Sequence, residues 1–203
     1  MKAHSGAVRS VCFGNSGKSL LTASDDKTLK IWSLPSKRFQ ATLSGHSNWV
    51  RSAVFSSDSH LVASGGDDKS VRIWDTENAT CINTFLEPAN TIHSVQFHPS
   101  GYTVAAGGAD KSLKIWDLRS NQLIQHYDAH DGTVNRIRYH PSGNYILTAS
   151  TDSTLKIWDI REGHLIYTLR GHRLLIIIII FLISYFFKIF FYLLFKIVML
   201  LLV

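Results

Sequence analysis

A fixed spacing between residues of the same type organises most of this chain. A repeat of about 40 residues is one supersecondary unit that stacks on its neighbours to bury a shared core. Four copies follow one another without an insertion, and we expect them near residues 3–44, 45–86, 87–128 and 129–170. The residues that keep the spacing are tryptophan (Trp32, Trp74, Trp116, Trp158), aspartate (Asp26, Asp68, Asp110, Asp152) and histidine (His4, His46, His130, His172, with Pro88 in the missing place).

Each repeat is predicted to form four short β-strands. In the first repeat these are "AVRSVCF", "SLLTAS", "TLKIW" and "FQATL". Leu29 and Ile31 share one face of the third strand while Lys30 takes the other, which is the period of a strand. The first strand breaks this alternation between Val8 and Val11, and such a slip indicates a β-bulge. No part of residues 3–170 has a helical period, so the sequence predicts an all-β fold.

A Trp-Asp pair ends the third strand in three repeats, at Trp74-Asp75, Trp116-Asp117 and Trp158-Asp159. Short strands at a period near forty with this dipeptide resemble the blades of WD40 β-propellers. The resemblance implies four consecutive blades, here an open arc of a seven-bladed ring within a WD40 region at residues 1–172.

The same resemblance implies a buried network of histidine, hydroxyl, aspartate and tryptophan side chains inside each blade. Gly66 and Gly108 replace the hydroxyl in repeats two and three, and we expect these blades to be looser. The residues matched to this network are His4, Ser24, Asp26 and Trp32; His46, Asp68 and Trp74; Asp110 and Trp116; and His130, Ser150, Asp152 and Trp158.

A set of histidine, serine and aspartate also occurs in catalytic triads, but triads do not recur at a fixed spacing along a chain. The ten histidines show no HExxH spacing, and there is no phosphate-binding GxxxxGK(S/T) loop. We therefore expect no catalytic residues, no metal ligands, no cofactor and no enzymatic activity.

A more specific resemblance rests on "NWVRSAVFSSDSHLVASGGDDKSVRIWD", "FHPSGYTVAAGGADKSLKIWD" and "YHPSGNYILTASTDSTLKIWDIREGHLIYTLRGH". These strings resemble the Proteome of Centriole protein 1 family of centriolar WD40 proteins. The resemblance implies a non-enzymatic scaffold that supports the assembly and stability of centrioles and basal bodies, and thereby cilia. It also implies partners that are centriolar or microtubule-associated proteins. Members carry seven blades and a coiled-coil region, and this chain departs from that pattern by having four blades and no coiled coil.

Partner contacts in WD40 propellers usually lie on the rim formed by the loops before strand one and after strand two. The matching positions are Arg9, Asp25, Trp49, Arg51, Asp67 and His93. Trp49 stands out, because the other repeats have Ala7, Thr91 and Thr133 at that place. Exposed tryptophan and arginine side chains often dominate protein interfaces.

An alternative function is a substrate receptor of a cullin-4 ubiquitin ligase. "WDLR" and "WDIR" resemble the tandem WDxR boxes of such receptors, and Arg119 and Arg161 would contact the ligase adaptor.

The cysteine content and the N-terminal sequence predict a cytoplasmic protein, and the charge argues for no particular partner. The net charge of +6 includes Lys188 and Lys196, and the remaining basic residues are spread and lie beside acids, which argues against nucleic-acid binding. Cys12 and Cys81 make no disulfide framework, and the N-terminus lacks an apolar signal segment. Together with the centriolar resemblance, this predicts that the protein is located at the cytoskeleton, at the centriole or centrosome and at the basal body of the cilium.

Residues 173–203 form a hydrophobic tail of a different kind, which we expect to fold as a C-terminal helix, because a helix satisfies its own backbone hydrogen bonds. From residue 174 it is almost unbroken leucine, isoleucine and phenylalanine, which is long enough for a membrane-spanning helix. Lys188 and Lys196 would be costly in a bilayer, and the tail has no glycine, alanine or threonine, which help to pack spanning helices. This composition favours read-through of non-coding sequence over a membrane anchor. The membrane-anchored WD40 adaptor is a second alternative, and any membrane contact is expected only through residues 174–203.

Overall fold

A computed structural model describes residues 3–86 and 90–170, and these ranges form four separate antiparallel sheets of four strands each. In every sheet the strands lie side by side in chain order, as in β1-β2-β3-β4. The described ranges contain no helix, and so none that could cross a membrane. The predicted all-β propeller fold of four consecutive blades is confirmed. The predicted C-terminal helix lies outside the described residues.

The strand bounds repeat closely from sheet to sheet. They are β1 (Val8–Phe13), β2 (Ser19–Ser24), β3 (Thr28–Ser33) and β4 (Arg38–Ser44); β5 (Val50–Phe55), β6 (Leu61–Gly66), β7 (Ser70–Asp75) and β8 (Thr80–Leu86); β9 (Ile92–Phe97), β10 (Thr103–Gly108), β11 (Leu113–Asp117) and β12 (Gln122–Tyr127); and β13 (Val134–Tyr139), β14 (Tyr145–Ser150), β15 (Thr154–Asp159) and β16 (His164–Arg170).

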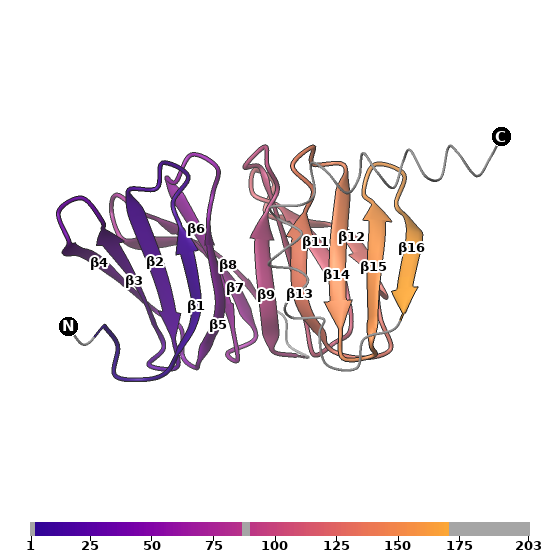
Figure 1. Cartoon of the computed structure of the whole chain (residues 1–203), viewed down its shortest axis with the longest axis horizontal. Coiled ribbons are helices and arrows are strands. Elements are labelled where there is room, and N and C mark those ends of the chain that lie inside the picture. The colour runs from indigo at the N-terminus through magenta and orange to yellow at the C-terminus, as the bar shows by residue number, and fades with distance from the viewer. Residues whose placement is uncertain (1–2, 87–89, 171–203) are drawn as a thin grey trace.

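The four sheets stack face to face like neighbouring blades. Their first strands contact one another in succession, β1 with β5, β5 with β9 and β9 with β13. Figure 1 shows the first and fourth sheets at opposite ends of the longest axis of the molecule. The described residues therefore form an open arc of blades.

The first strand of every sheet carries a β-bulge, as the broken alternation predicted. Val8 pairs with Ser24 and Ser10 pairs with Ala23, so Arg9 is left without a partner in the ladder. The same interruption falls at Arg51 in β5, His93 in β9 and Asn135 in β13. A bulged residue is free of the pleat, and its side chain is re-aimed toward the end of the sheet.

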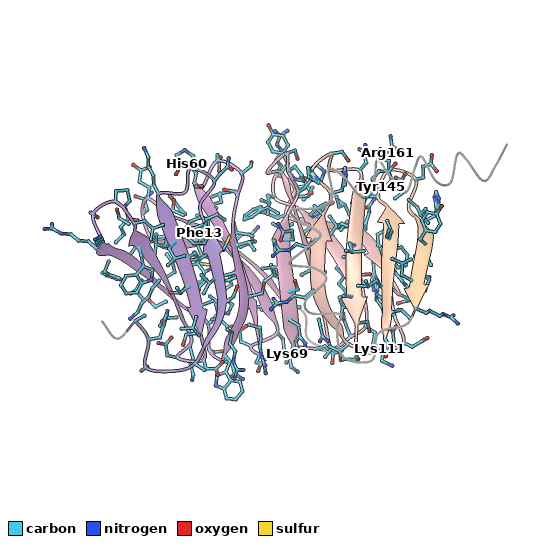
Figure 2. The ribbon with its side chains drawn as sticks, viewed as in Figure 1. Phe13, His60, Lys69, Lys111, Tyr145 and Arg161 are labelled. Carbon is cyan, nitrogen blue, oxygen red and sulfur yellow. The ribbon has the colours of Figure 1, made fainter. Side chains whose placement is uncertain are left out.

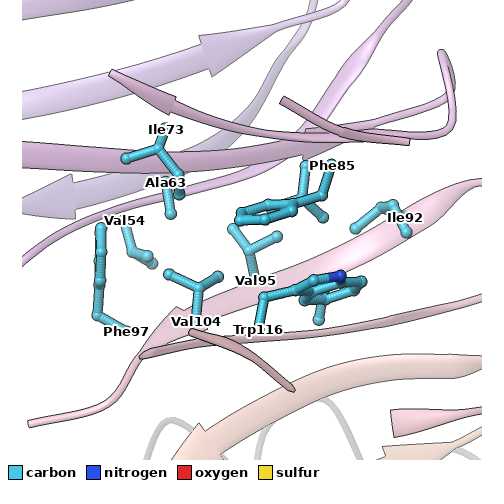
Figure 3. Packing of buried hydrophobic residues seen from close by; sticks show 11 residues of the cluster. Val54, Ala63, Ile73, Phe85, Ile92, Val95, Phe97, Val104 and Trp116 are labelled. Carbon is cyan, nitrogen blue, oxygen red and sulfur yellow. The ribbon is translucent and has the colours of Figure 1, made fainter. Parts of the chain in front are cut away.

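The core lies between sheets. Figure 3 shows Val54, Ala63, Ile73 and Phe85 of the second sheet packing against residues of the third, among them Val95 and Trp116. All members of this cluster are buried, so neighbouring sheets remove each other's apolar faces from water.

A serine in the first strand adds a polar link across each of these interfaces. The Ser52 Oγ lies 3.2 Å from the Val95 amide nitrogen, and the Ser94 Oγ lies 3.1 Å from the Ile137 amide nitrogen. Ser10 makes the matching contact with Ala53 at 3.3 Å. In each case the serine accepts a backbone N–H of the next sheet, which fixes the height at which the two sheets meet.

Within residues 3–86 and 90–170, no other sheet covers a similar apolar face of the first sheet. Val11 and Phe13 are 57% and 64% exposed, whereas their counterparts in the second sheet, Ala53 and Phe55, are 1% and 8% exposed. Similar strand chemistry is thus buried in one sheet and open to solvent in the other, as an end blade of an open arc requires.

We predict that Phe55→Ala and Phe13→Ala have very different effects on stability. The first substitution should lower the free energy of unfolding by about 3–5 kcal/mol, because it leaves a cavity in a packed cluster. The second should change it by less than about 1 kcal/mol, because Phe13 packs against no sheet on that face. Urea unfolding followed by tryptophan fluorescence measures both. A large loss for Phe13→Ala would show that this face is covered in solution.

Candidate functional site

In each of three sheets, a chain of hydrogen-bonded side chains links the strands of that sheet to one another. In the second sheet, His46 Nδ1 lies 2.7 Å from Asp68 Oδ2, and His46 Nε2 lies 2.7 Å from Ser64 Oγ. The Trp74 indole N–H donates to the same Ser64 oxygen at 2.7 Å. A neutral histidine protonated on Nδ1 satisfies every member, because Asp68 accepts, the serine hydroxyl donates to Nε2, and its oxygen accepts the indole.

The first and fourth sheets repeat this chain with threonine. The Thr22 Oγ1 lies 2.8 Å from His4 Nε2 and 3.1 Å from Trp32 Nε1. In the fourth sheet Thr148 bridges His130 at 2.7 Å and Trp158 at 3.0 Å.

The sequence prediction placed the hydroxyl of this chain two residues too late. Ser24 and Ser150 do not reach the histidine; each accepts the backbone amide of the following aspartate, at 3.1 Å to Asp26 and 3.2 Å to Asp152. Gly66 therefore does not remove a hydrogen bond from the second sheet, because Ser64 supplies the hydroxyl that contacts His46. The expectation that repeat two lacks this hydroxyl is wrong. Thr22, Ser64 and Thr148 carry a hydroxyl in three of the four repeats, whereas the position of Ser24 and Ser150 carries one in only two, and this difference was the signal that could have located the position.

The third sheet lacks the chain for a different reason. Ala106 occupies the hydroxyl position, and Pro88, in the place of the histidine, lies outside the described residues. Asp110 is instead held by Ser112, whose Oγ donates at 2.6 Å, and by the Lys114 ammonium at 2.9 Å. In this sheet a lysine thus pairs with the aspartate in place of a histidine.

The aspartates of the chain are partly buried and ionised. Burial alone would raise the pKa of Asp68, but hydrogen bonds from His46 and Ser70 lower that pKa to about 2. Asp152 has a pKa of about 2 for the same reason, with Thr154 and His130 as donors against burial. Burial lowers the pKa of His130, which agrees with its neutral form in the chain.

The chain has the connectivity of a catalytic triad but not its accessibility. Ser64 and Thr148 are 0% exposed, and each oxygen already accepts an indole N–H. A nucleophile must reach a substrate, so this arrangement serves the fold. Across residues 3–86 and 90–170, no group of three histidine, cysteine, aspartate or glutamate side chains is placed to hold a metal ion.

A second cluster lies at one edge of the first two sheets, and we call it the Trp49 cluster: Arg9, Asp25, Trp49, Arg51 and Asp67. Arg9 binds Asp25 through Nε at 2.8 Å and Nη2 at 2.6 Å. Arg51 binds Asp67 in the same bidentate way, at 2.8 Å and 2.7 Å. The centroid of the Trp49 ring lies 5.6 Å from Arg9 Cζ and 5.4 Å from Arg51 Cζ, within the range of cation–π contacts.

The bulges build this cluster. Arg9 and Arg51 are the residues that the bulges release from the ladder, and each guanidinium meets the aspartate of the turn after strand two. A backbone hydrogen bond of 2.8 Å from the Asp67 N–H to the Trp49 carbonyl fixes the tryptophan beside that turn. The hydrogen bond from Arg9 lowers the pKa of Asp25, so the pair stays charged.

The cluster does not continue into the other two sheets. His93 lies at the third bulge, where its Nε2 is 3.1 Å from Thr91 Oγ1, and Ala109 replaces the aspartate. The fourth sheet has Thr133, Asn135 and Thr151 at these places. Five of the six predicted rim residues are thus brought together, while His93 belongs to a separate local contact.

Arg119 and Arg161, the two arginines of the ligase hypothesis, both have partners within the fold. The Arg119 Cζ lies 3.8 Å from the centroid of the Tyr102 ring. The Arg161 Nη2 lies 3.3 Å from Asp159 Oδ2, within its own WDxR sequence. Figure 2 shows Arg161 on the edge opposite to Lys69 and Lys111.

We predict that the bridging hydroxyl stabilises the fold. Thr148→Val keeps the shape of the side chain but leaves the buried Trp158 N–H without an acceptor, so it should lower the free energy of unfolding by about 1–3 kcal/mol. Thr148→Ser is the matched control, because the second sheet uses serine at this place. If both variants unfold at the same urea concentration as the parent, the hydroxyl contributes nothing.

We also predict that stability falls in acid between about pH 4 and pH 2. An unfolded aspartate titrates near pH 3.9. Because the folded pKa of Asp68 and Asp152 is lowered to about 2, their contribution is complete above the unfolded pKa and is lost as the pH falls through the folded one. Unfolding midpoints measured across this range should drop less steeply for Asp68→Asn than for the parent. Asp128→Asn, at a fully exposed carboxylate, should keep the parent's slope.

A comparison with known families accords with this architecture. The model of a β-propeller family described as nucleolar protein 10-like, N-terminal domain, matches residues 5–182. A search of curated proteins found no match. With four sheets of the propeller kind and a match over most of its length, the chain belongs to the nucleolar protein 10-like family of β-propeller domains.

Proposed function

We propose that this chain is a non-enzymatic scaffold that binds other proteins through the Trp49 cluster. β-Propeller domains generally bind proteins. The observation that supports this binding site is that the Trp49 cluster occurs in only two of the four sheets, although the sheets are otherwise repeats of one another. Blade architecture does not need an indole and two Arg–Asp pairs here, because the third and fourth sheets form without them.

The cluster has the properties of a preorganised binding surface. Trp49 is 43% exposed, although most tryptophans of the chain are buried or half-buried. Both arginines are held by bidentate hydrogen bonds to an aspartate, so little side-chain freedom remains to be lost when a partner docks. Tryptophan and arginine at such positions are the residue types that contribute most to interface affinity.

The finer proposal is a role at centrioles and basal bodies, in the cytoplasm and cytoskeleton. Its support is the resemblance of residues 139–172 and the two preceding strings to Proteome of Centriole protein 1, which extends into loop and turn residues. The name of the matched family suggests the nucleolus as the competing location. Partners at the centriole would be centriolar or microtubule-associated proteins.

Two alternatives are less favoured. A cullin-4 ligase receptor would need Arg119 and Arg161 for its adaptor, and both guanidinium groups already contact side chains of the fold. A membrane-anchored adaptor depends wholly on residues 174–203, which lie outside the described residues. A domain of WD40 repeats at residues 1–172 with a tail of read-through sequence at 173–203 is the organisation that we propose.

We predict that the tagged chain collects at centrioles and that this needs the Trp49 cluster. Imaging with centriolar and nucleolar markers in ciliated cells measures the location. Trp49→Ala with Arg51→Ala should reduce the centriolar signal at least fivefold, because a partner loses its central contacts. Tyr102→Ala removes an exposed aromatic residue from a different loop and should leave the signal unchanged. A nucleolar signal would contradict the centriolar role, and a signal unaffected by the double variant would contradict the site.

A further inference from the structure

A row of lysines lies along the turns that border the Trp49 cluster. Lys27, Lys69 and Lys111 occupy the same place in the turn after strand two of the first three sheets, directly after the aspartate that recurs in every repeat. Their φ angles are +69°, +63° and +66°, so the three backbones share one left-handed conformation and present the side chain in the same way. All three lysines are exposed, and Figure 2 shows Lys69 and Lys111 on one edge of the arc.

The fourth sheet ends this row. Ser153 takes the place of the lysine with a φ of +65°, and the nearby Asp131 is exposed. The same backbone turn therefore forms without a lysine, so the fold does not require the charge. The row covers the first three sheets, with Trp49 in the middle one.

The charges at this edge are distributed unevenly. Arg9 and Arg51 are neutralised by Asp25 and Asp67 at hydrogen-bonding distance. Lys27 and Lys111 make no ion pair within residues 3–86 and 90–170. The edge thus presents an apolar indole within a charge-balanced centre, and lysine ammonium groups on either side of it.

We propose that this edge binds an acidic peptide segment with one apolar anchor residue, laid in an extended form across the turns of the first three sheets. The anchor packs on the Trp49 indole, and carboxylates on both sides meet Lys27 and Lys111. This inference rests on the proposed scaffold function and names the chemistry of its partner. Charge complementarity of this kind steers association and fixes the register of the bound segment.

A nucleic acid fits the same edge less well. The Nε and Nη2 donors of both arginines, which a phosphate would use, already bind carboxylates. A nucleic-acid backbone carries a charge at every nucleotide, and the Trp49 cluster offers no net positive charge to match it, because its two arginines are paired with Asp25 and Asp67. A peptide can place its carboxylates opposite the lysines alone and an apolar side chain opposite the indole.

The test is fluorescence anisotropy of the full chain with three labelled probes. The first is a twelve-residue peptide with glutamates on both sides of a central leucine, the second has glutamine in place of every glutamate, and the third is an oligothymidylate of the same net charge. We expect the acidic peptide to bind at least tenfold more tightly than the other two. Its affinity should fall further as salt is raised.

Substitutions at this edge test whether the acidic peptide binds there. Lys27→Glu with Lys111→Glu, and Trp49→Ala alone, should each weaken the acidic peptide at least fivefold. Lys18→Glu with Lys37→Glu is the matched control, because these exposed lysines lie in loops outside the turns that follow strand two, and it should bind as the parent does. Circular dichroism checks that every variant is folded. Equal binding by the rim and control variants, or tighter binding of the oligothymidylate, would overturn the proposal.

The outcomes separate this inference from the scaffold proposal. If Trp49→Ala with Arg51→Ala abolishes centriolar recruitment while the acidic peptide fails to bind the parent, the partner chemistry is wrong and the scaffold site stands. If the peptide binds as expected but recruitment is unchanged, the partner chemistry is supported and the centriolar use of the edge is wrong.

Discussion

Packing between neighbouring sheets is the interaction on which the rest of this structure depends. A sheet of four short strands has two apolar faces, and both leave water only when another sheet lies on each side. The cluster shared by the second and third sheets shows this directly, since Ala63 and Ile73 of one pack against Val95 and Val104 of the other. The constant length of the repeat follows from that requirement, because every blade must offer the same face to the next one.

The fit across each interface is set by pairs of residues far apart in the chain. Gly107 packs against Val134 and Ile137, and a Cβ added there would lie 2.8 Å and 2.9 Å from their methyl groups. Gly65 meets Ile92 and Val95 in the same way. The first sheet has Ala23 at this position, and the strand that faces it carries the smaller Ala53 where the later sheets carry Val95 and Ile137. Volume is therefore balanced between sheets, and one residue can change only with its partner.

The sequence could reveal what repeats but not which of two equivalent side chains makes a contact. Strand bounds, the bulge and the Trp49 cluster were all readable, because each leaves a mark either in the alternation along a strand or in the spacing of the repeats. Thr22 and Ser24 lie on the same face of β2, and alternation cannot separate them. The structure places His4 between Asp26 and Thr22, in contact with both. The link between Ser52 and the next sheet was missed for a related reason, since a serine in a strand has no pattern that shows where its hydroxyl points.

The bulges that interrupt the ladder allow the residue types at the edge of the arc to differ between sheets, while the residue types on the packed faces stay similar. A residue in the ladder must suit its strand neighbours and the adjacent sheet, whereas Arg9, Arg51, His93 and Asn135 are excluded from the ladder and are constrained by neither. Substitution at these positions changes the surface at almost no cost to the core. The four sheets accordingly share their buried aspartates and tryptophans but differ at every bulge except the first two, where the Arg–Asp pairs meet around Trp49. The recognition site that we propose thus lies in the one part of each blade that the packing leaves unconstrained.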